Sequence, residues 1–244
     1  MANYLTIDIG NTNAKAAAWS GNDCLGSPFW GELSAVDIEH LAAQVNGRFD
    51  CAAICSVGSG FAPVVEAAKV LSDKVLIVNG DSRLPISLDA YYPASNLGPD
   101  RIAALCGAHS LCPGQDVLVV DCGTCVTYDL LSAEGRFLGG NIAPGLGMRL
   151  RAMHQFTAKL PLVDSDSDPA LWGTSTATAM QGGAFFGIVA EIQYYISACP
   201  KPTRLILAGG RSSDLLPHLG NLNPTFCPAL VLQGLKHIID YNEN

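Results

Sequence analysis

The stretch YLTIDIGNTNAK, residues 4–15, joins an apolar strand to a turn of small polar residues. Residues 4–9 are β-branched or apolar for the most part, and residues 15–20 (KAAAWS) can return as a second strand. The turn glycine lets backbone N–H groups approach a phosphate, and the asparagine and threonine beside it add neutral donors. Asp8, at the end of the first strand, can hold Mg²⁺ directly or through water. The stretch predicts a hairpin whose tip binds phosphate.

The same pattern returns half a chain later, in DVLVVDCGT at residues 116–124. An apolar strand again ends in an aspartate, Asp121, followed by glycine and threonine, and residues 127–131 can return as the partner strand. A single Asp-x-Gly sequence is weak evidence, because such sequences commonly make plain turns. Two copies in one context indicate a duplicated lobe with two phosphate-binding loops.

Around these two hairpins, strands alternate with helices. Ser34 is a suitable N-cap for a helix to about residue 46, and residues 51–57, 62–71 and 74–78 indicate strand, helix and strand. The other expected elements are a strand at 137–142, helices at 145–157 and 174–197, strands at 204–208 and 229–232, and a terminal helix from residue 234. Cys112-Pro113-Gly114 marks a boundary between an N-terminal lobe, 1–114, and a C-terminal lobe, 115–244, with an active site expected in the cleft between them.

Composition limits the classes of partner. A hydrophobic fraction of 49% against 15% charged residues predicts a well-buried globular protein. The net charge of -8 and the lack of a Lys/Arg cluster argue against a nucleic-acid surface, since neutralising phosphates needs a basic stripe. No run of about 18 apolar residues occurs, and the N-terminus lacks a basic, apolar leader, so we expect a cytoplasmic protein that does not enter a membrane.

The nine cysteines are an odd number for a disulfide framework, and most lie in apolar runs, which favours reduced, buried thiols. Cys122 and Cys125 form a CxxC, for which a redox pair or half a zinc site is the alternative to small packing residues. No second CxxC and no paired histidine spacing completes a metal site. The histidines are scattered singly, at His40, His109, His154, His218 and His237.

The sequence GPDR at residues 98–101 offers a base and a positive charge side by side. Asp100 can orient an acceptor hydroxyl and accept its proton during phosphoryl transfer. The alternative is that Asp100 is only the N-cap of a helix over residues 101–111. Gly209 and Gly210, after an apolar strand, would let a nucleoside approach the backbone. The P-loop and Rossmann phosphate motifs are absent.

Together these segments resemble the type III pantothenate kinases. The matching motifs, in family order across nearly the whole chain, are DIGNTNAK at 8–15, GPDR at 98–101, DCGTCVT at 121–127, GGNIAPGL at 139–146, KLP at 159–161, GTSTATAMQGG at 173–183, AGG at 208–210 and LQGL at 232–235. Three positions depart from the family pattern, namely Pro99, Ser175 and the Tyr92-Pro93 pair, and none removes a group that the chemistry needs.

The resemblance implies an α/β fold of two duplicated actin-like (ribonuclease H-like) lobes, each a mixed sheet with flanking helices. It implies an enzyme that uses ATP to phosphorylate the primary hydroxyl of pantothenate, the first committed step of coenzyme A biosynthesis. Mg²⁺ and a monovalent cation, K⁺ or NH₄⁺, are the implied cofactors, and a homodimer is the implied assembly.

The family also implies site residues. Those for ATP are Asp8, Ile9, Gly10, Asn11, Thr12, Asn13, Ala14, Lys15 and Thr124. Those for pantothenate are Tyr91, Gly98, Pro99, Asp100, Arg101 and Thr176, with Thr176 reaching from the partner subunit. Asp100 would be the proton acceptor, Asp121 would hold the monovalent cation, and Asp8 would hold Mg²⁺. Tyr91 is followed by Tyr92, so either ring can be the one that contacts the substrate.

Two other functions stay open at this stage. One is a nucleotide-binding regulatory or accessory protein of the same family, against which the intact Asp100 argues. The other is a kinase of the same superfold that acts on another small hydroxylated substrate, because a fold does not fix a substrate. The short chain leaves little room for the inserted domains of larger sugar kinases.

Overall fold

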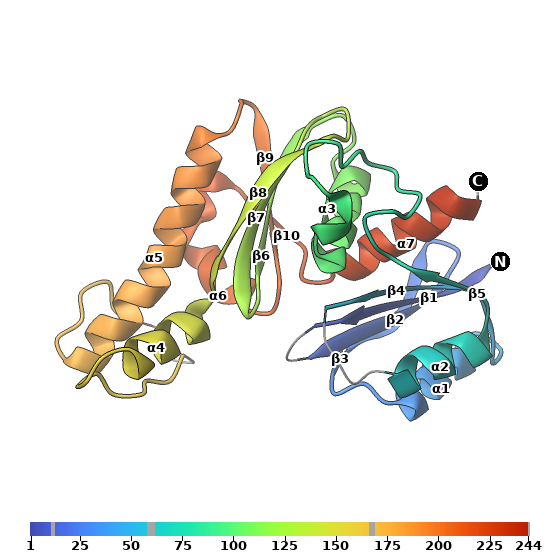
Figure 1. The fold of residues 1–244 in the computed structure, drawn as a ribbon, viewed down its shortest axis with the longest axis horizontal. Coiled ribbons are helices and arrows are strands. Elements are labelled where there is room, and N and C mark those ends of the chain that lie inside the picture. The colour runs from blue at the N-terminus through green and yellow to red at the C-terminus, as the bar shows by residue number, and fades with distance from the viewer. Residues whose placement is uncertain (11–12, 58–61, 166–168, 244) are drawn as a thin grey trace. The chain divides into compact units, whose positions relative to one another are not determined.

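The structure, a computed structural model, describes residues 1–10, 13–57, 62–165 and 169–243. The chain forms two compact units, each drawn in Figure 1 with its own sheet. The first unit consists of residues 1–114, 132–138 and 229–244, and the second consists of residues 115–131 and 139–228.

The sheet of the first unit has five strands in the order β3-β2-β1-β4-β5. Their bounds are β1 Asn3–Ile9, β2 Ala14–Ser20, β3 Asp23–Gly31, β4 Phe49–Ser56 and β5 Ser72–Ile77. The central strand β1 pairs antiparallel with β2 and parallel with β4, so the sheet is mixed. Side chains alternate along β1: Leu5, Ile7 and Ile9 enter one core cluster, and Thr6 and Asp8 point to the opposite face.

The second sheet repeats this plan in the order β10-β9-β6-β7-β8. Its strands are β6 Asp116–Cys122, β7 Cys125–Leu131, β8 Phe137–Pro144, β9 Thr203–Ala208 and β10 Thr225–Phe226. The central strand β6 again pairs antiparallel with the next strand along the chain, β7, and parallel with a later one, β9. The expected duplication into two mixed sheets with flanking helices is confirmed.

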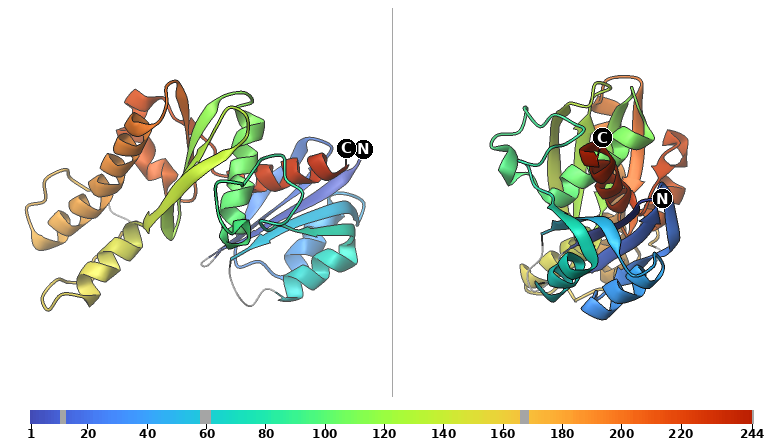
Figure 2. Two further views of the ribbon diagram at one scale, coloured as in Figure 1. Left: turned by 45° about the horizontal axis from the view of Figure 1, so that its top comes forward. Right: turned by 90° about the vertical axis from the view of Figure 1, so that its right-hand side faces the viewer.

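Helices cover both faces of the first sheet, as Figures 1 and 2 show. On one face lie α1 (Ala35–Ala43) and α2 (Ala62–Leu71), whose buried residues complete the core cluster over β1. The other face contacts α3 (Pro99–Leu111) and α7 (Leu230–Glu243), which also pack on each other. Ser34 is the N-cap of α1, as predicted, and forms a capping box with Asp37.

In the second unit, α4 (Leu146–Gln155) and α5 (Thr176–Ala198) share a core cluster with β6, β7 and β9. The remaining helical pieces are α6 (Ser212–Leu215) and the 3₁₀ turns Ala94–Asn96, Leu216–His218 and Gly220–Leu222. Within the described ranges, no helix is both long enough and apolar enough to cross a membrane.

Three expectations about the elements need correction. The strand expected at 229–232 is wrong: α7 begins at Leu230, four residues before its expected start, and the edge strand is Thr225–Phe226 instead. A short apolar run fits a strand or a buried helix equally well, and here Leu230, Val231 and Leu232 are all buried in the helix. Strand β3 was not expected, since most of its side chains are half-buried or exposed.

The compact units are also not continuous along the chain, unlike the expected lobes 1–114 and 115–244. The boundary after Gly114 is common to both divisions, but residues 132–138 and α7 return to the first unit. The histidines are likewise not all isolated: His109 on α3 and His237 on α7 lie with ring nitrogens 3.4 Å apart. Burial, with a smaller effect of His109, lowers the pKa of His237 below its ordinary value.

Candidate active site

The first unit holds the Asp8 carboxylate at the carboxyl end of its central strand. Asp8 is buried, its Oδ2 lies 3.3 Å from Lys15 Nζ, and its Oδ1 accepts a hydrogen bond from the Cys55 thiol at 3.5 Å. Burial raises the pKa of Asp8 above its ordinary value, and the ammonium of Lys15 opposes this rise. A buried carboxylate that keeps one cationic neighbour is well suited to meet a second cation.

The register of β1 and β2 brings the Lys15 side chain next to Asp8. The two residues are directly paired across the antiparallel β1–β2 ladder, so their side chains leave the same face of the sheet. Lys15 Nζ also lies 4.9 Å from the ring centroid of Trp30, which is its cross-strand neighbour on β3. The half-buried ammonium is therefore held between a carboxylate and an indole, at the base of the GNTN turn.

Asp100 joins this site from a distant segment of the same unit. Its negative charge acts on Asp8, for which it is one of the causes of the raised pKa. The N-cap of α3 is Gly98, with Pro99 as the first helical residue, so the interpretation of Asp100 as a simple N-cap is wrong. Asp100 lies in the first turn instead, where its Oδ1 accepts a hydrogen bond from the backbone N–H of Arg101 at 2.9 Å.

Gly98 leaves room for that carboxylate. A Cβ built on Gly98 would lie 2.5 Å from Asp100 Oδ1, although the backbone of Gly98 has φ -54°, which any residue can adopt. We expect Gly98→Ala to push the Asp100 side chain aside and to lower kcat by roughly tenfold or more, since small misplacements of a reacting group are costly. Steady-state kinetics beside circular dichroism would check this. Full kcat in the Gly98→Ala enzyme would contradict it.

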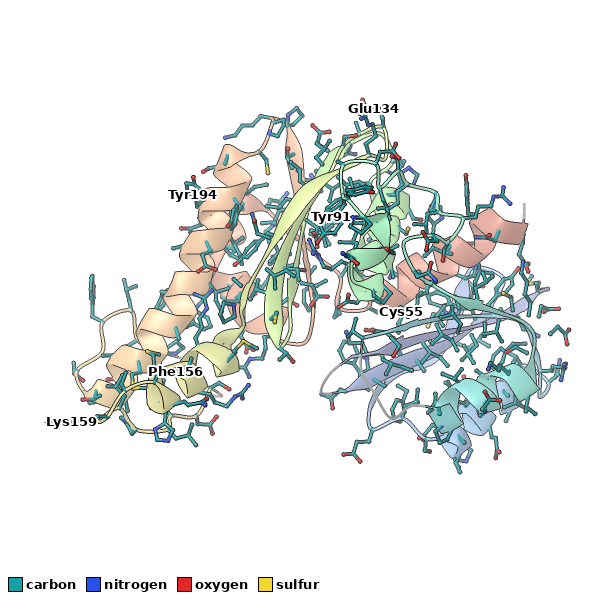
Figure 3. All side chains as sticks on the ribbon, in the orientation of Figure 1. Cys55, Tyr91, Glu134, Phe156, Lys159 and Tyr194 are labelled. Atoms are coloured by element: carbon teal, nitrogen blue, oxygen red, sulfur yellow. The ribbon has the colours of Figure 1, made fainter. Side chains whose placement is uncertain are left out.

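Arg101 lies beside a pair of aromatic rings. It is 6% exposed, and its guanidinium carbon lies 5.9 Å from the ring centroid of Tyr91 and 6.0 Å from that of Phe137. The two rings are themselves 5.9 Å apart. Tyr92 points away, with 97% exposure, so Tyr91 is the tyrosine that the structure brings to Arg101. Figure 3 shows Tyr91 beside α3.

The second unit presents Asp121 in the position that Asp8 has in the first. Asp121 lies at the end of β6, directly before the turn of Gly123 and Thr124. A Cβ on Gly209 would lie 2.5 Å from Asp121 Oδ1 and 2.7 Å from the backbone nitrogen of Cys122, and its φ is +85°. Gly209 therefore has to be glycine for β9 to approach the DCGT turn so closely.

A pocket opens beside the same turn. Its lining includes Cys122, Gly123, Leu146, Phe185 and the ion pair of Arg211 and Asp214. The walls are mostly apolar, with a charged group at one side, which is the usual make-up of a small-molecule site. Thr124 and Thr176 are both exposed in this unit, Thr176 as the first residue of α5 after the N-cap Ser175.

Within the described ranges, the remaining residues predicted for the hairpin tip make no side-chain contact that bears on the chemistry described above. Ile9 and Ala14 are buried strand ends, Gly10 donates to the carbonyl of Asn13, and Asn13 is exposed. Asn11 and Thr12 lie outside the described residues.

The predicted CxxC shows none of the marks of a zinc site. Cys122 and Cys125 are free, and no group of three His, Cys, Asp or Glu side chains in the described ranges could hold a metal ion. A magnesium site is a different case, since Mg²⁺ commonly takes one or two protein carboxylates and fills its other positions with phosphate oxygens and water. Asp8, with the negative charge of Asp100 acting on it, is the kind of carboxylate that could take part in such a site.

Sequence reasoning missed three neighbours of the site: Cys55, Trp30 and Phe137. Each reaches the site through strand register or tertiary packing with a residue far away in the chain, and no local motif marks it. The adjacency of β1 and β4 could have indicated Cys55, because a parallel pair of strands that end together puts their last residues side by side.

Comparisons with known proteins identify the class. The fold matches a ROK hexokinase from Thermus thermophilus at a TM-score of 0.51 and 15% identity, covering 97% of this chain and 98% of that one. It matches a Campylobacter jejuni protein, described as a Baf family transcriptional activator, at a TM-score of 0.63 and 23% identity, covering 98% and 99%. Such identities show the fold alone. The two mixed sheets, each with an aspartate at the end of its central strand, define an actin-like fold.

Sequence comparison narrows the class to a family. Residues 4–198 match the family described as type III pantothenate kinase. A type III pantothenate kinase from Porphyromonas gingivalis is 38% identical over 249 aligned residues, which cover 99% of this chain and 100% of that protein. This chain belongs to the type III pantothenate kinase family.

Proposed function

We propose that this protein transfers the γ-phosphoryl group of ATP to the primary hydroxyl of pantothenate, the first step of coenzyme A biosynthesis. The observation that carries the proposal is the grouping of Asp8, Lys15, Asp100 and Arg101 in one unit. These side chains supply the anion sites, the base and the positive charge that phosphoryl transfer needs. Family membership supplies the substrate class.

For ATP, the proposal assigns the hairpin tip, residues 8–15, and Thr124 to the phosphates. Lys15 is the cation already placed at that tip, and a phosphate oxygen would compete with Asp8 for its ammonium. The nucleoside would lie against the backbone of Gly209 and Gly210, beside the pocket of the second unit.

For pantothenate, the proposal assigns Tyr91 and residues 98–101, with Thr176 reaching from a partner subunit. Arg101 is buried against the pair of rings Tyr91 and Phe137, which limits the movement of its guanidinium and would preorganise it for the carboxylate of the substrate. Asp100 orients the acceptor hydroxyl and takes its proton as the new bond to phosphorus forms.

The proposal assigns the two cations to the aspartates at the ends of the two central strands. Asp8 beside Asp100 would hold Mg²⁺, which, when bound with ATP, neutralises charge on the phosphates. Asp121, an oxygen donor beside the close turn of Gly123 and Gly209, would hold K⁺ or NH₄⁺. The net charge of -8 makes such counter-ions necessary for binding an anionic nucleotide.

We also propose a cytoplasmic homodimer. Large apolar side chains stand exposed on the second unit, among them Phe156 after α4, Trp172 before α5 and Tyr194 on α5. Figure 3 shows Phe156 and Tyr194 on the outside of this unit. Exposed apolar groups in such number are typical of an interface, and light scattering on the purified protein measures the mass directly.

The test is ADP release with MgATP and pantothenate, with and without K⁺. We expect turnover that needs pantothenate, disappears when Mg²⁺ is chelated and falls sharply when Na⁺ replaces K⁺. Nucleotide binding without turnover on pantothenate would instead favour a regulatory protein. Turnover on another hydroxylated compound would favour a kinase of different specificity.

A further inference from the structure

The Asp8 carboxylate is held at both of its oxygens by different chemical groups. Oδ2 faces the ammonium of Lys15 at 3.3 Å, and Oδ1 accepts from the Sγ of Cys55 at 3.5 Å. Strand register creates both contacts, since Asp8 pairs with Lys15 on β2 and with Cys55 on β4. The carboxylate therefore sits in the middle of three adjacent strand ends. Figure 3 shows Cys55 on the part of the sheet below α3.

We propose that Cys55 is a positioning residue that fixes the orientation of the Asp8 carboxylate for the magnesium nucleotide. The inference rests on the proposed function of Asp8 and goes beyond it by assigning a role to a buried thiol. If a bound phosphate drew the Lys15 ammonium away from Oδ2, the thiol would still hold Oδ1, so the carboxylate would keep one of its two contacts and be less free to rotate.

Cys55 donates as a protonated thiol, which is the ordinary form of a cysteine at neutral pH. Its side chain is 0% exposed, and its Sγ lies 3.5 Å from Asp8 Oδ1. A thiol with its proton is a weak donor, but a buried carboxylate oxygen is a strong acceptor. The hydrogen bond offsets part of the cost of burying Asp8 as an anion.

The second unit shows that this arrangement is not a necessity of the fold. Asp121 occupies the equivalent strand end, where register pairs it with Thr127 on β7 and with Ala208 on β9. The methyl side chain of Ala208 cannot donate a hydrogen bond to a carboxylate. Asp8, which is proposed for Mg²⁺, therefore has a thiol beside it on the parallel strand, whereas Asp121, which is proposed for the monovalent cation, has a methyl group there.

A plain packing role is the competing explanation, and the chain contains a matched control for it. Cys51 lies on the same strand and the same face as Cys55 and is also 0% exposed. Its Sγ donates to the backbone oxygen of Ala52, at 3.7 Å, and not to a carboxylate of the site among the described residues. Replacing either cysteine removes the same buried volume, but only Cys55→Ala removes a donor to Asp8.

The experiment compares Cys55→Ala, Cys55→Ser and Cys55→Val with Cys51→Ala. Calorimetry measures the binding of ADP with Mg²⁺ and in EDTA, and kinetics measure KM for MgATP and kcat. We expect Cys55→Ala and Cys55→Val to weaken MgADP binding by about five- to tenfold, the usual weight of an ordinary hydrogen bond, because a thiol is a weak donor. Metal-free ADP binding should change by less than about twofold. The serine variant, which keeps a donor, should recover most of the loss.

The valine variant roughly keeps the side-chain volume, and melting curves show whether each variant is folded. The inference is overturned if Cys55→Ala and Cys51→Ala weaken MgADP binding equally. It is also overturned if a folded Cys55→Ser protein does not recover MgADP binding, or if Cys55→Ala weakens metal-free ADP binding as much as MgADP binding. The proposed function stands or falls separately, on pantothenate turnover by the wild-type enzyme. Should the wild type bind MgADP but not phosphorylate pantothenate, the comparison of the cysteine variants still decides the role of Cys55.

Discussion

Asp100→Asn is expected to lower kcat by about two to four orders of magnitude, the usual contribution of a general base. An amide is nearly the same size as a carboxylate and can still accept the hydrogen bond from the Arg101 N–H, so the first turn of α3 should persist. It cannot accept the proton of a hydroxyl. The loss should therefore fall on kcat, with the KM for pantothenate changed much less.

Asp37→Asn is the matched control for this substitution. Asp37 also lies in the first turn of a helix, α1, but it is only half-buried and closes the capping box with Ser34. The hydrogen bonds from Ser34 lower the pKa of Asp37, so the folded state favours its anion. We expect Asp37→Asn to leave kcat unchanged and to lower the melting temperature slightly. An Asp100→Asn enzyme that retains more than about a tenth of the wild-type kcat would exclude Asp100 as the base.

The duplicated fold could be predicted because its signals are local. Each central strand is a run of apolar residues that ends in Asp and a small turn, at Asp8 and again at Asp121, and each returns through a neighbouring strand. The helix start that carries Asp100 could be predicted for the same reason, since GPDR is a short motif at the beginning of α3. Hairpins and helix starts involve residues close in sequence, so a single chain reveals them.

The features that escaped prediction depend on contacts between distant segments. The apolar run at 230–232 fits a strand until α3 is known to lie against it, and β3 has too few buried side chains to signal a strand. The donor at Cys55 exists only through the register of β1 on β4. No local pattern shows that α7 returns to the first unit, although two glycines on α3 and α7 make that return possible.

Those glycines are Gly107 on α3 and Gly234 on α7, where the two helix backbones approach each other closely. A Cβ on Gly234 would overlap the carbonyl oxygen of Ala103 and lie 2.8 Å from the backbone nitrogen of Gly107. A Cβ on Gly107 would lie 2.6 Å from the carbonyl oxygen of Leu230. These are backbone atoms, which cannot rotate aside as a flexible side chain can.

Gly234→Ala is therefore expected to force α7 away from α3 and to lower the free energy of unfolding by about 2–3 kcal/mol, a typical cost of overpacking. For a protein of this size the melting temperature should fall by roughly 5–10 °C. Helix propensity alone predicts the opposite sign, since alanine is favoured over glycine in a helix interior by about 1 kcal/mol. The sign of the measured shift thus decides between local preference and helix packing.

Gly220→Ala is the control, because the substitution is the same and no heavy atom lies within 4 Å of the added Cβ. There we expect no loss, or a small gain of about 0.5 kcal/mol from the stiffer unfolded chain. Because α3 carries Asp100 and Arg101 in its first turn, Gly234→Ala should also reduce kcat. A Gly234→Ala protein that melts at or above the wild-type temperature would mean that α7 does not pack on α3 at this distance in solution.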